Sequence, residues 1–342
     1  MLPSGRIASP TSALSVADSD PATASRSRPA AAQPALDGDG PGSSFDRDTA
    51  VRRLSAAART GEEITFAAEL SPAWRAMRGP HGGYLAAVML RALVETAEDP
   101  SRAPRSLNVH YARVPESGPV LIRARLERAG RSLSTLSARM EQEGALIALA
   151  TAAFSVPWSA TEISELPMPD VAGPDPGRET SPEMIEAVEQ GLAPPFLRQL
   201  IMQRRIGGQL FGGSADPMEV GAWLGLRDPL RPLDPVALAM LSDVGAPPPL
   251  LRLGEPAMAS TVDLTVHFRT RTPLAHSERG ELCYARLRTQ LLHEGFFEAD
   301  GVIWASDGTV LAQSRQLGTG LHEPAGETCL HVFDALRCVI AH

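Results

Sequence analysis

Residues 261–268 read TVDLTVHF, and residues 104–111 read PRSLNVHY. Both stretches contain the pattern Leu-x-Val-His-aromatic, in which apolar and polar residues alternate with the period of a half-buried β-strand. His267 follows His110 by 157 residues. The repeat predicts that an internal duplication has produced two copies of one strand. Only the second copy carries an aspartate, Asp263; the first copy has Ser106 at that position.

The segments before the two strands also match. Residues 79–100 carry apolar side chains at helical spacing nearly all round, which predicts a buried helix of about 15 residues. Residues 234–245 predict a second helix, with Asp234 as N-cap and Pro235 at its first position. Each half therefore runs strand, buried helix and four antiparallel strands, so that we expect an α+β fold made of two copies of one unit.

The remaining elements are expected in the same order in both halves. Glu143-Gly144 and Asp307-Gly308 predict hairpin turns at equivalent places, and residues 51–60 predict a short helix. The expected strands are 64–70, 105–113, 119–130, 132–144 and 145–155 in the first half, and 198–208, 219–228, 260–270, 280–292, 294–306 and 309–320 in the second.

The length of 342 residues suggests about two domains. Residues 1–48 are rich in Ala, Ser, Pro, Gly and Asp and are expected to form a disordered tail. The first unit is expected over 49–157, a Pro-rich linker over 158–195, the second unit over 196–321, and a C-terminal tail over 322–342.

Composition excludes several classes of protein. The net charge of −8 argues against a nucleic-acid binder, because contact with phosphates needs a basic surface. Three scattered cysteines, Cys283, Cys329 and Cys338, indicate reduced thiols in a cytoplasmic protein, and without CxxC or a His/Cys cluster we expect no metal and no cofactor. No apolar run reaches about 18 residues, so no membrane span is expected.

A long buried helix wrapped by an antiparallel sheet is the hotdog fold. The segments HGGYLAAVMLRA, SLNVHYARV, RPLDPVALAMLSD, TVDLTVHFR and DGTVLAQSRQLG resemble the double-hotdog acyl-CoA thioesterases of the acyl-CoA thioesterase II superfamily. The resemblance covers residues 64–321. It implies a tandem hotdog that hydrolyses acyl-CoA to free acid and CoA in lipid metabolism. Two hotdogs in one chain mimic the usual hotdog dimer, and further pairing into a homo-oligomer is compatible with the pattern.

The resemblance also implies site residues. In the family, an Asp, a Ser or Thr and a Gln of the second hotdog hold the attacking water. Asp263 matches the Asp, and Gln316 in AQSRQLG matches the Gln. Counting back from Gly295 gives Arg288 for the middle position or, one residue later, Thr289, which has the required hydroxyl. In the first copy Ser106 and Ala152 stand at the Asp and Gln positions, which implies one site per chain.

These side chains have the chemistry that thioester hydrolysis needs. The Asp263 carboxylate can orient and deprotonate water, which is typically worth ~10²–10⁴ in rate, while Gln316 and Thr289 can hold the water by neutral hydrogen bonds. The turn Gly82-Gly83-Tyr84 at the helix start can offer backbone N–H groups to the oxyanion. One such donor is worth ~10²–10³ in rate.

Structural explanations compete with each of these roles. Asp263 can simply share a polar strand face with His267, Gln316 can be a solvated strand residue, and the Gly pair can serve close helix packing. Arginines such as Arg269 and Arg271, or Arg204 and Arg205, are candidates for CoA phosphates, although exposed strand arginines are common.

Two other functions remain open. One is a non-catalytic protein that binds acyl-CoA or an acyl chain. The other is a hotdog hydratase, which would carry an Asp/His pair near an Asn-Pro-type turn at the helix start. The turn here reads GPHGGYL, with neither Asp nor Asn, and this lowers the hydratase interpretation.

Overall fold

The structure is a computed structural model that describes residues 43–55, 60–177, 179–180, 182–191, 193–208, 213, 216–228, 231–253, 257–275 and 280–322. All of them lie within one compact unit. In this part of the chain no helix has the length and apolar character needed to cross a membrane.

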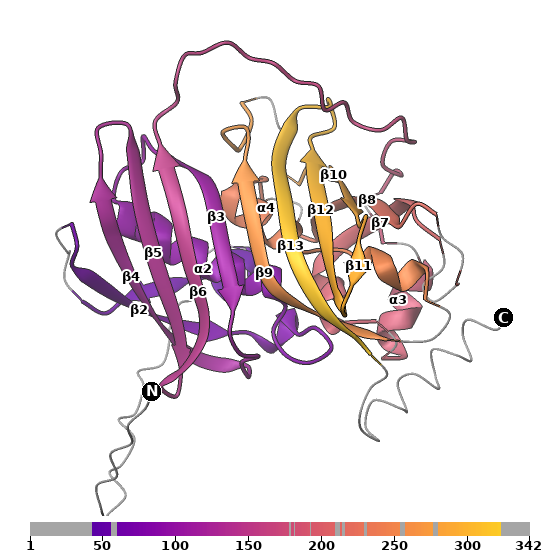
Figure 1. Cartoon of the computed structure of the whole chain (residues 1–342), viewed down its shortest axis with the longest axis horizontal. Coiled ribbons are helices and arrows are strands. Elements are labelled where there is room, and N and C mark those ends of the chain that lie inside the picture. The colour runs from indigo at the N-terminus through magenta and orange to yellow at the C-terminus, as the bar shows by residue number, and fades with distance from the viewer. Residues whose placement is uncertain are drawn as a thin grey trace, which may run out of the picture. The chain divides into compact units, whose positions relative to one another are not determined.

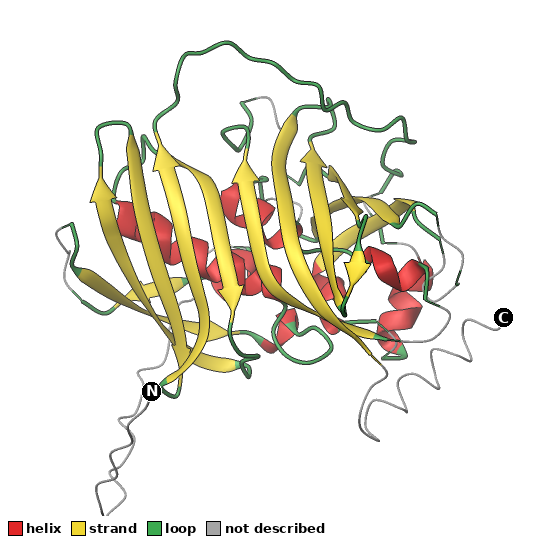
Figure 2. Cartoon of the chain, viewed as in Figure 1, coloured by secondary structure: helices red, strands yellow, loops and turns green. Residues whose placement is uncertain are grey.

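One continuous antiparallel sheet forms the framework (Figures 1 and 2). Its strand order is β1-β2-β4-β5-β6-β3-β9-β13-β12-β10-β8-β7, and β11 pairs with β12. The two halves of the chain thus meet where β3 pairs with β9. The strands are β1 Val51–Arg53, β2 Glu63–Leu70, β3 Ala103–Tyr111, β4 Gly118–Ala129, β5 Leu133–Gln142, β6 Ala145–Ser155, β7 Leu200–Ile206, β8 Glu219–Leu226, β9 Met258–Phe268, β10 Cys283–Arg288, β11 Leu292–His293, β12 Phe296–Trp304 and β13 Val310–His322.

Two helices, α2 and α4, pack against each other on one face of the sheet, as Figure 2 shows. This arrangement confirms the expected tandem hotdog. The helices are α1 Ser44–Asp48, α2 Gly82–Ala97, α3 Pro182–Glu189 and α4 Pro235–Leu241, and the 3₁₀ turns are η1 Pro72–Trp74, η2 Pro195–Gln199 and η3 Pro248–Leu251.

The two central helices begin for different reasons. In α4, Asp234 caps the first turn by accepting a hydrogen bond from the Ala237 amide at 2.8 Å, as the sequence predicts. The helix is shorter than expected, because residues 242–245 form turns after it. In α2, His81 is the N-cap residue but makes no side-chain cap, so the first amides of this helix need other partners.

The register between β3 and β9 records the duplication. Each β3 residue corresponds to the β9 residue 157 positions later, and exchanging all corresponding residues leaves the list of paired residues unchanged. A local two-fold axis therefore passes between the central pair, Asn108 and Thr265. At that pair the side-chain amide of Asn108 donates a hydrogen bond of 2.7 Å to the Thr265 hydroxyl. The partners are Ser106 with His267, Asn108 with Thr265, and His110 with Asp263.

Two expectations near the N-terminus need correction. Residues 51–60 do not begin a helix: β1 pairs with β2, and this sheet contact overrides the local pattern. The boundary of the tail is also too late. Helix α1 lies within residues 1–48 and buries Phe45, whose ring lies 5.2 Å from that of Trp74.

The Pro-rich segment 158–195 is packed on the second half of the sheet. The Trp304 indole N–H donates to the Leu166 carbonyl at 3.1 Å, and that of Trp223 donates to the Ala172 carbonyl at 2.8 Å. These bonds tie the segment to β12 and β8, so it acts as a strap along the sheet as well as a connection.

Candidate functional site

The start of α2 is bonded to the end of α4 from the other half of the chain. The Gly83 amide donates to Oδ2 of Asp243 at 2.7 Å. The same oxygen lies 3.5 Å from Nε2 of His81, and this nitrogen is also 3.2 Å from the Asp243 carbonyl oxygen. The Asp243 carboxylate, which belongs to the second hotdog, therefore accepts a hydrogen bond from an α2 amide that the N-cap residue His81 leaves without a partner.

This pair is buried, and burial works against both charges. It raises the pKa of Asp243, against the stabilising effects of His81 and the Gly83 amide. It lowers the pKa of His81, and the Asp243 charge opposes that shift. Because both groups facing Nε2 are acceptors, Nε2 carries the ring proton of the neutral imidazole. Nδ1 is buried and has no partner in the described part of the chain.

The two glycines are required by this contact. A Cβ on Gly83 would lie 2.4 Å from the Met240 carbonyl oxygen, and a Cβ on Gly82 would lie 2.7 Å from Oδ2 of Asp243. Close helix packing, the structural explanation of the pair, is therefore real.

The proposed oxyanion donors are not equally available. The Gly83 amide is already used by Asp243. The Tyr84 side chain points into the core of the first half, where its hydroxyl donates to the Asp48 carbonyl at 2.5 Å and its ring stacks on Trp74. Among the hydrogen bonds described, the backbone amides of Gly82 and Tyr84 remain unused.

Tyr111 connects this helix start with Asp263 electrostatically. Its hydroxyl donates to the Gly82 carbonyl at 2.8 Å. The pKa of Tyr111 is raised well above its ordinary value, first by burial and then by the negative charges of Asp243 and Asp263. Both carboxylates therefore lie within electrostatic range of one phenol.

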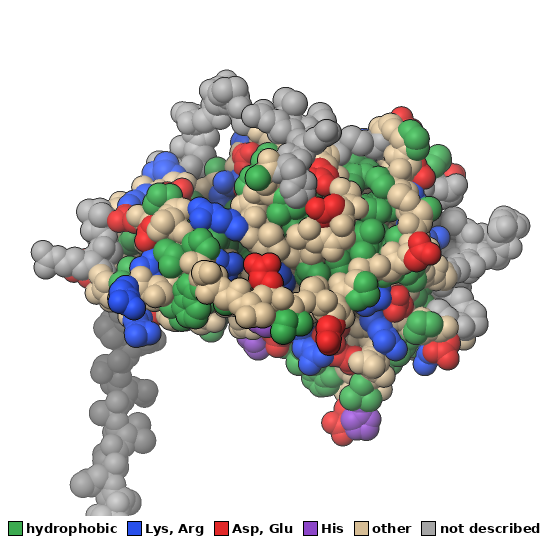
Figure 3. Space-filling view, turned by 90° about the horizontal axis from the view of Figure 1, so that it is seen from above, with side chains coloured by type: hydrophobic (Ala, Val, Ile, Leu, Met, Phe, Trp, Pro, Cys, Tyr) green, Lys and Arg blue, Asp and Glu red, His purple; other side chains and the backbone are tan. Residues whose placement is uncertain are grey.

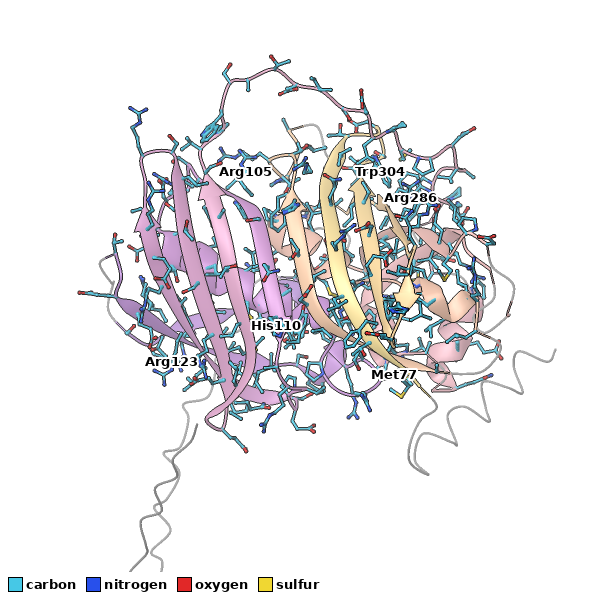
Figure 4. All side chains as sticks on the ribbon, viewed as in Figure 1. Met77, Arg105, His110, Arg123, Arg286 and Trp304 are labelled. Carbon is cyan, nitrogen blue, oxygen red and sulfur yellow. The ribbon has the colours of Figure 1, made fainter. Side chains whose placement is uncertain are left out.

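Asp263 sits at an irregularity of β9. It lies opposite His110 on β3 and Leu317 on β13, and β9 contains one extra residue, Val262, between the partners of Leu317 and Gly318. Such bulges change the direction of neighbouring side chains. Asp263 is half-buried, and its side chain makes no hydrogen bond or ion pair with the described residues. Figure 4 shows its neighbour His110 toward the lower end of β3.

Gln316 lies on the sheet face that covers the helices. Its direct neighbours across the strands, Leu264 and Ala299, are both fully buried, and Gln316 itself is 8% exposed. The Thr261 hydroxyl donates to Oε1 of Gln316 at 3.1 Å. The side-chain amide is thus held from the same strand that carries Asp263, and the explanation as a solvated strand residue does not fit.

The two candidates for the middle position differ in burial. Arg288 is exposed and lies opposite Asp300. Thr289, the next residue, is 3% exposed and its hydroxyl donates to the Glu298 carbonyl at 2.7 Å. Because the register places Thr289 one step beyond Arg288, it shares a row and a face with Gln316, with the small Ala299 between them.

The first half has no equivalent set. Leu107 faces Ala152 across β3 and β6 as Leu264 faces Gln316 across β9 and β13. Ala152 pairs with Leu136 on β5, which in turn pairs with Leu126 on β4. In the second half, Gln316 pairs with Ala299 on β12, and the register beyond β12 leads to Thr289 after β10. The first-half counterparts of Asp263, Thr289 and Gln316 are Ser106, Leu126 and Ala152.

Sequence reasoning missed Asp243. The turn GPHGGYL has no acidic residue of its own, but the fold brings one from more than 150 residues away, at the end of the second helix. The only signal was an acidic residue in an otherwise apolar helix end. No cluster of three or more His, Cys, Asp or Glu that could hold a metal ion occurs among the described residues.

Comparisons with known proteins agree with this architecture. The family described as the acyl-CoA thioesterase N-terminal domain matches residues 70–155, and the acyl-CoA thioesterase C-terminal domain matches residues 169–319. A search of curated proteins found no match.

Solved structures share the fold over most of the chain. A hot dog fold protein of unknown function from Alicyclobacillus acidocaldarius is 27% identical, with a TM-score of 0.68 over 83% of this chain and 100% of that one. An acyl-CoA thioesterase II from Mycobacterium marinum is 20% identical, with a TM-score of 0.62 over 83% and 100%. The tesB protein of Mycobacterium avium subsp. paratuberculosis is 19% identical, with a TM-score of 0.60 over 82% and 98%.

Proposed function

The chain belongs to the acyl-CoA thioesterase family, and from this premise we propose that it hydrolyses an acyl-CoA thioester to a free acid and CoA. The observation that carries the proposal is the arrangement at the second hotdog. Gln316 and Thr289 share one buried row. Asp263 comes directly before Leu264, the residue of β9 that pairs with Gln316, and its charge acts on Tyr111, whose hydroxyl is bonded to the start of α2. We also propose that the reaction takes place in the cytoplasm, from the scattered cysteines, and that it belongs to lipid metabolism, from the family resemblance.

The proposed reaction uses these groups in order. Asp263 takes a proton from a water held by Gln316 and Thr289, and the water oxygen attacks the thioester carbonyl carbon. The negative charge that develops on the carbonyl oxygen is met by the amides of Gly82 and Tyr84 at the helix start. The carbon–sulfur bond then breaks, and the proton on Asp263 passes to the CoA sulfur.

The Thr289 hydroxyl has a defined role in this scheme. Its proton is committed to the Glu298 carbonyl, so its oxygen lone pairs are left to accept a hydrogen bond from the water. Gln316 receives a hydrogen bond from Thr261 at Oε1, which leaves its NH₂ group as a donor to the water oxygen. One acceptor and one donor can thus orient the water before Asp263 deprotonates it.

The test measures release of CoA with a thiol reagent from short, medium, long and aryl acyl-CoAs. In Asp263→Ala, kcat is expected to fall at least ~100-fold because the base is lost. Asp170→Ala, an exposed carboxylate on the connecting segment, is the matched control and should match the natural chain. Turnover that survives Asp263→Ala would refute the site, and acyl-CoA binding without any turnover would favour the non-catalytic binder.

One observation favours a second function, the hydratase. The buried His81–Asp243 pair supplies the acid–base couple that the turn sequence lacked, with Nδ1 of His81 unpartnered. Formation of 3-hydroxybutyryl-CoA from crotonyl-CoA tests this, because hydrolysis of the thioester would not give that product. If it occurs, it should disappear in His81→Phe and survive Asp263→Ala. Absence of the hydroxyacyl-CoA product with the natural chain would eliminate this function.

A further inference from the structure

A tight turn over residues 75–80 leads directly into α2. It is closed by a hydrogen bond of 2.7 Å from the Ala76 amide to the Gly79 carbonyl, and residues 75 and 80 pair across its base. Met77 and Arg78 form the tip of the turn, and both side chains are exposed. Figure 4 places Met77 at the lower end of the sheet, where β9 begins and β13 ends. The tip therefore belongs to the first hotdog but lies beside the second.

The segment that follows β3 braces this turn. A Cβ on Gly79 would lie 2.4 Å from Cγ1 of Val114 and 2.8 Å from the Pro115 carbonyl oxygen. The chain is also fixed just after the turn, where the His81 amide donates to the Trp74 carbonyl at 2.8 Å. The tip is thus held at a set position relative to the first amides of α2, which are the proposed oxyanion donors.

Arg78 reaches β9 where that strand has no neighbour from the first hotdog. The pairing of β9 with β3 ends at Asp263, so Ser260 meets no β3 residue in the sheet. Nη1 of Arg78 lies 3.4 Å from Oγ of Ser260. The next residue, Thr261, donates to Gln316. Arg78 therefore stands at the surface where the two parts of the proposed site, the α2 start and β9, come together.

The charge of Arg78 is not neutralised by a carboxylate in the part of the chain that the structure describes. Its one hydrogen bond there, to Ser260, is 3.4 Å long and therefore weak. Figure 3 looks onto the other end of the sheet, where arginine side chains gather on the left half, over the first hotdog, with Asp and Glu side chains among them. The sequence contains no lysine, so a phosphorylated substrate can meet a permanently charged basic side chain only at an arginine.

The position of Arg78 along β9 suits the diphosphate of CoA. Gln316 pairs with Leu264, four residues along β9 from Ser260, a separation of ~13 Å at the rise of an antiparallel strand. The pantetheine arm of CoA has about 13 bonds between its sulfur and the diphosphate, and it spans ~15 Å at the ~3.3–3.6 Å that an extended chain covers in three bonds. A thioester at the row of Gln316 can therefore place its diphosphate beside Arg78.

We propose that Arg78 is a specificity-determining residue that binds the diphosphate of CoA and so distinguishes CoA esters from shorter thioesters. The inference rests on the proposed hydrolysis, and it adds the residue that recognises the leaving group. The planar guanidinium offers two parallel N–H donors to one phosphate group. Binding of CoA exchanges the weak contact with Ser260 for these charge-assisted hydrogen bonds.

The experiment compares the CoA ester and the N-acetylcysteamine ester of the acyl group that turns over fastest, because the second ester lacks the diphosphate. In Arg78→Gln, KM for the CoA ester is expected to rise ~10-fold or more with kcat nearly unchanged, since a charge-assisted hydrogen bond is lost. The value of kcat/KM for the N-acetylcysteamine ester should stay within about twofold. Arg128→Gln, which removes an exposed arginine of β4, is the matched control and should change neither ester.

Two further measurements separate this contact from a structural role and from hydrolysis. Ser260→Ala removes the partner of Arg78 on β9 and should leave KM for the CoA ester within about twofold. Calorimetric titration with CoA and with dephospho-CoA, which lacks only the 3′-phosphate, measures binding without turnover. Both dissociation constants should rise ~10-fold or more in Arg78→Gln. Thermal midpoints verify that each variant is folded.

The results that would overturn the proposal are distinct from those that would overturn hydrolysis. Equal losses on the two esters would assign Arg78 a structural role. A natural chain that binds no CoA, or an Arg78→Gln variant that binds it equally well, would also overturn the proposal. A loss for CoA alone, with dephospho-CoA unchanged, would exclude the diphosphate. If the natural chain hydrolyses neither ester, the proposed function fails, and the CoA titration still decides on Arg78.

Discussion

At the scale of single residues, hydrogen bonds define roles that residue identity leaves open. Thr289 and Arg288 are adjacent in the sequence, yet one is buried with a committed proton and the other is exposed. Gly83 offers an amide to the candidate oxyanion, yet the Asp243 carboxylate already accepts from it. Substitutions that change one hydrogen-bonding group and keep its volume therefore test the site most directly.

The hydroxyl of Thr289 gives the first such test. Thr289→Val keeps the shape and removes the lone pairs that we expect to hold the water, so kcat should fall roughly 10–100-fold with KM changed much less. Thr289→Ser keeps the hydroxyl and should recover most of the activity. Steady-state CoA release measures kcat and KM of both variants, and Thr151→Val, on the exposed face of β6, is the control. Equal activity in the Val and Ser variants would remove Thr289 from the site.

The buried Asp243 predicts a pH-dependent stability. Burial raises its folded pKa above the ordinary value of 3.8, so between that value and the folded pKa the folded chain binds more protons than the unfolded chain. The free energy of unfolding due to this group therefore falls as pH rises through that window. Asp243→Asn can still accept from the Gly83 amide without a charge. At pH 8 its melting midpoint should rise by roughly 2–4 °C, the shift that about 1 kcal/mol gives.

The low-pH arm checks the cause. Near pH 4 the advantage of Asp243→Asn should shrink or reverse, because the raised pKa leaves the natural carboxyl less charged there than at pH 8 and the variant no longer supports a charge on His81. Thermal unfolding followed by circular dichroism at both pH values measures this. The same shift at pH 4 and pH 8 would show that the charge of Asp243 is not responsible.

At the scale of elements, the decisive contact joins the first turn of α2 to the turn that follows α4. Neither helix has the local signals for it, because His81 caps no amide of its own helix and Asp243 lies beyond the end of α4. The two glycines allow the helices to approach this closely. The geometry of the candidate oxyanion turn is thus fixed by an element from the other half of the chain.

Gly83→Ala tests this contact. The added Cβ would lie 2.4 Å from the Met240 carbonyl oxygen, a backbone atom that cannot move alone. We expect the free energy of unfolding to fall by roughly 1–3 kcal/mol, as for overpacking in cores, and the hydrolytic rate to fall with it. Gly173→Ala, where a Cβ meets nothing within 4 Å, is the control. Urea unfolding that is equal for the two variants would contradict the close approach.

At the scale of the whole molecule, contacts of α1 near the N-terminus add a further link between the two halves, beside the β3–β9 pairing. Arg231, next to α4, pairs with Asp46 of α1 at 3.0 Å and with Asp234 at 2.9 Å, and its guanidinium stacks over Phe45. Asp46 also pairs with Arg91 of α2. Helix α1 therefore bridges the central helices of both hotdogs, although the sequence assigned it to a tail.

Two shortened chains test that bridge. A chain that starts at Ser43 keeps α1 and should unfold with the same free energy as the full chain. A chain that starts at Ala50 loses Phe45 and Asp46 and should be less stable by at least ~3 kcal/mol, the usual cost of removing a buried Phe. Phe45→Ala in the full chain should reproduce most of this loss. Equal urea midpoints for both shortened chains would mean that α1 contributes nothing.

The sequence by itself determined the duplicated architecture, because side-chain periodicity records which face of each strand and helix is buried. The twin strands around His110 and His267, the hairpin turns and the Asp234 cap all follow from local pattern, and the structure confirms them. The family resemblance named Asp263, Gln316 and Thr289, and their roles stay predictions.

Only the tertiary structure decided what depends on contacts between distant segments. The Asp243 carboxylate at the α2 start, the α1 bridge and the strap over the second half join residues that no local period connects. Local patterns report the burial of a face, whereas a site depends on which faces meet, and that is fixed by packing in three dimensions.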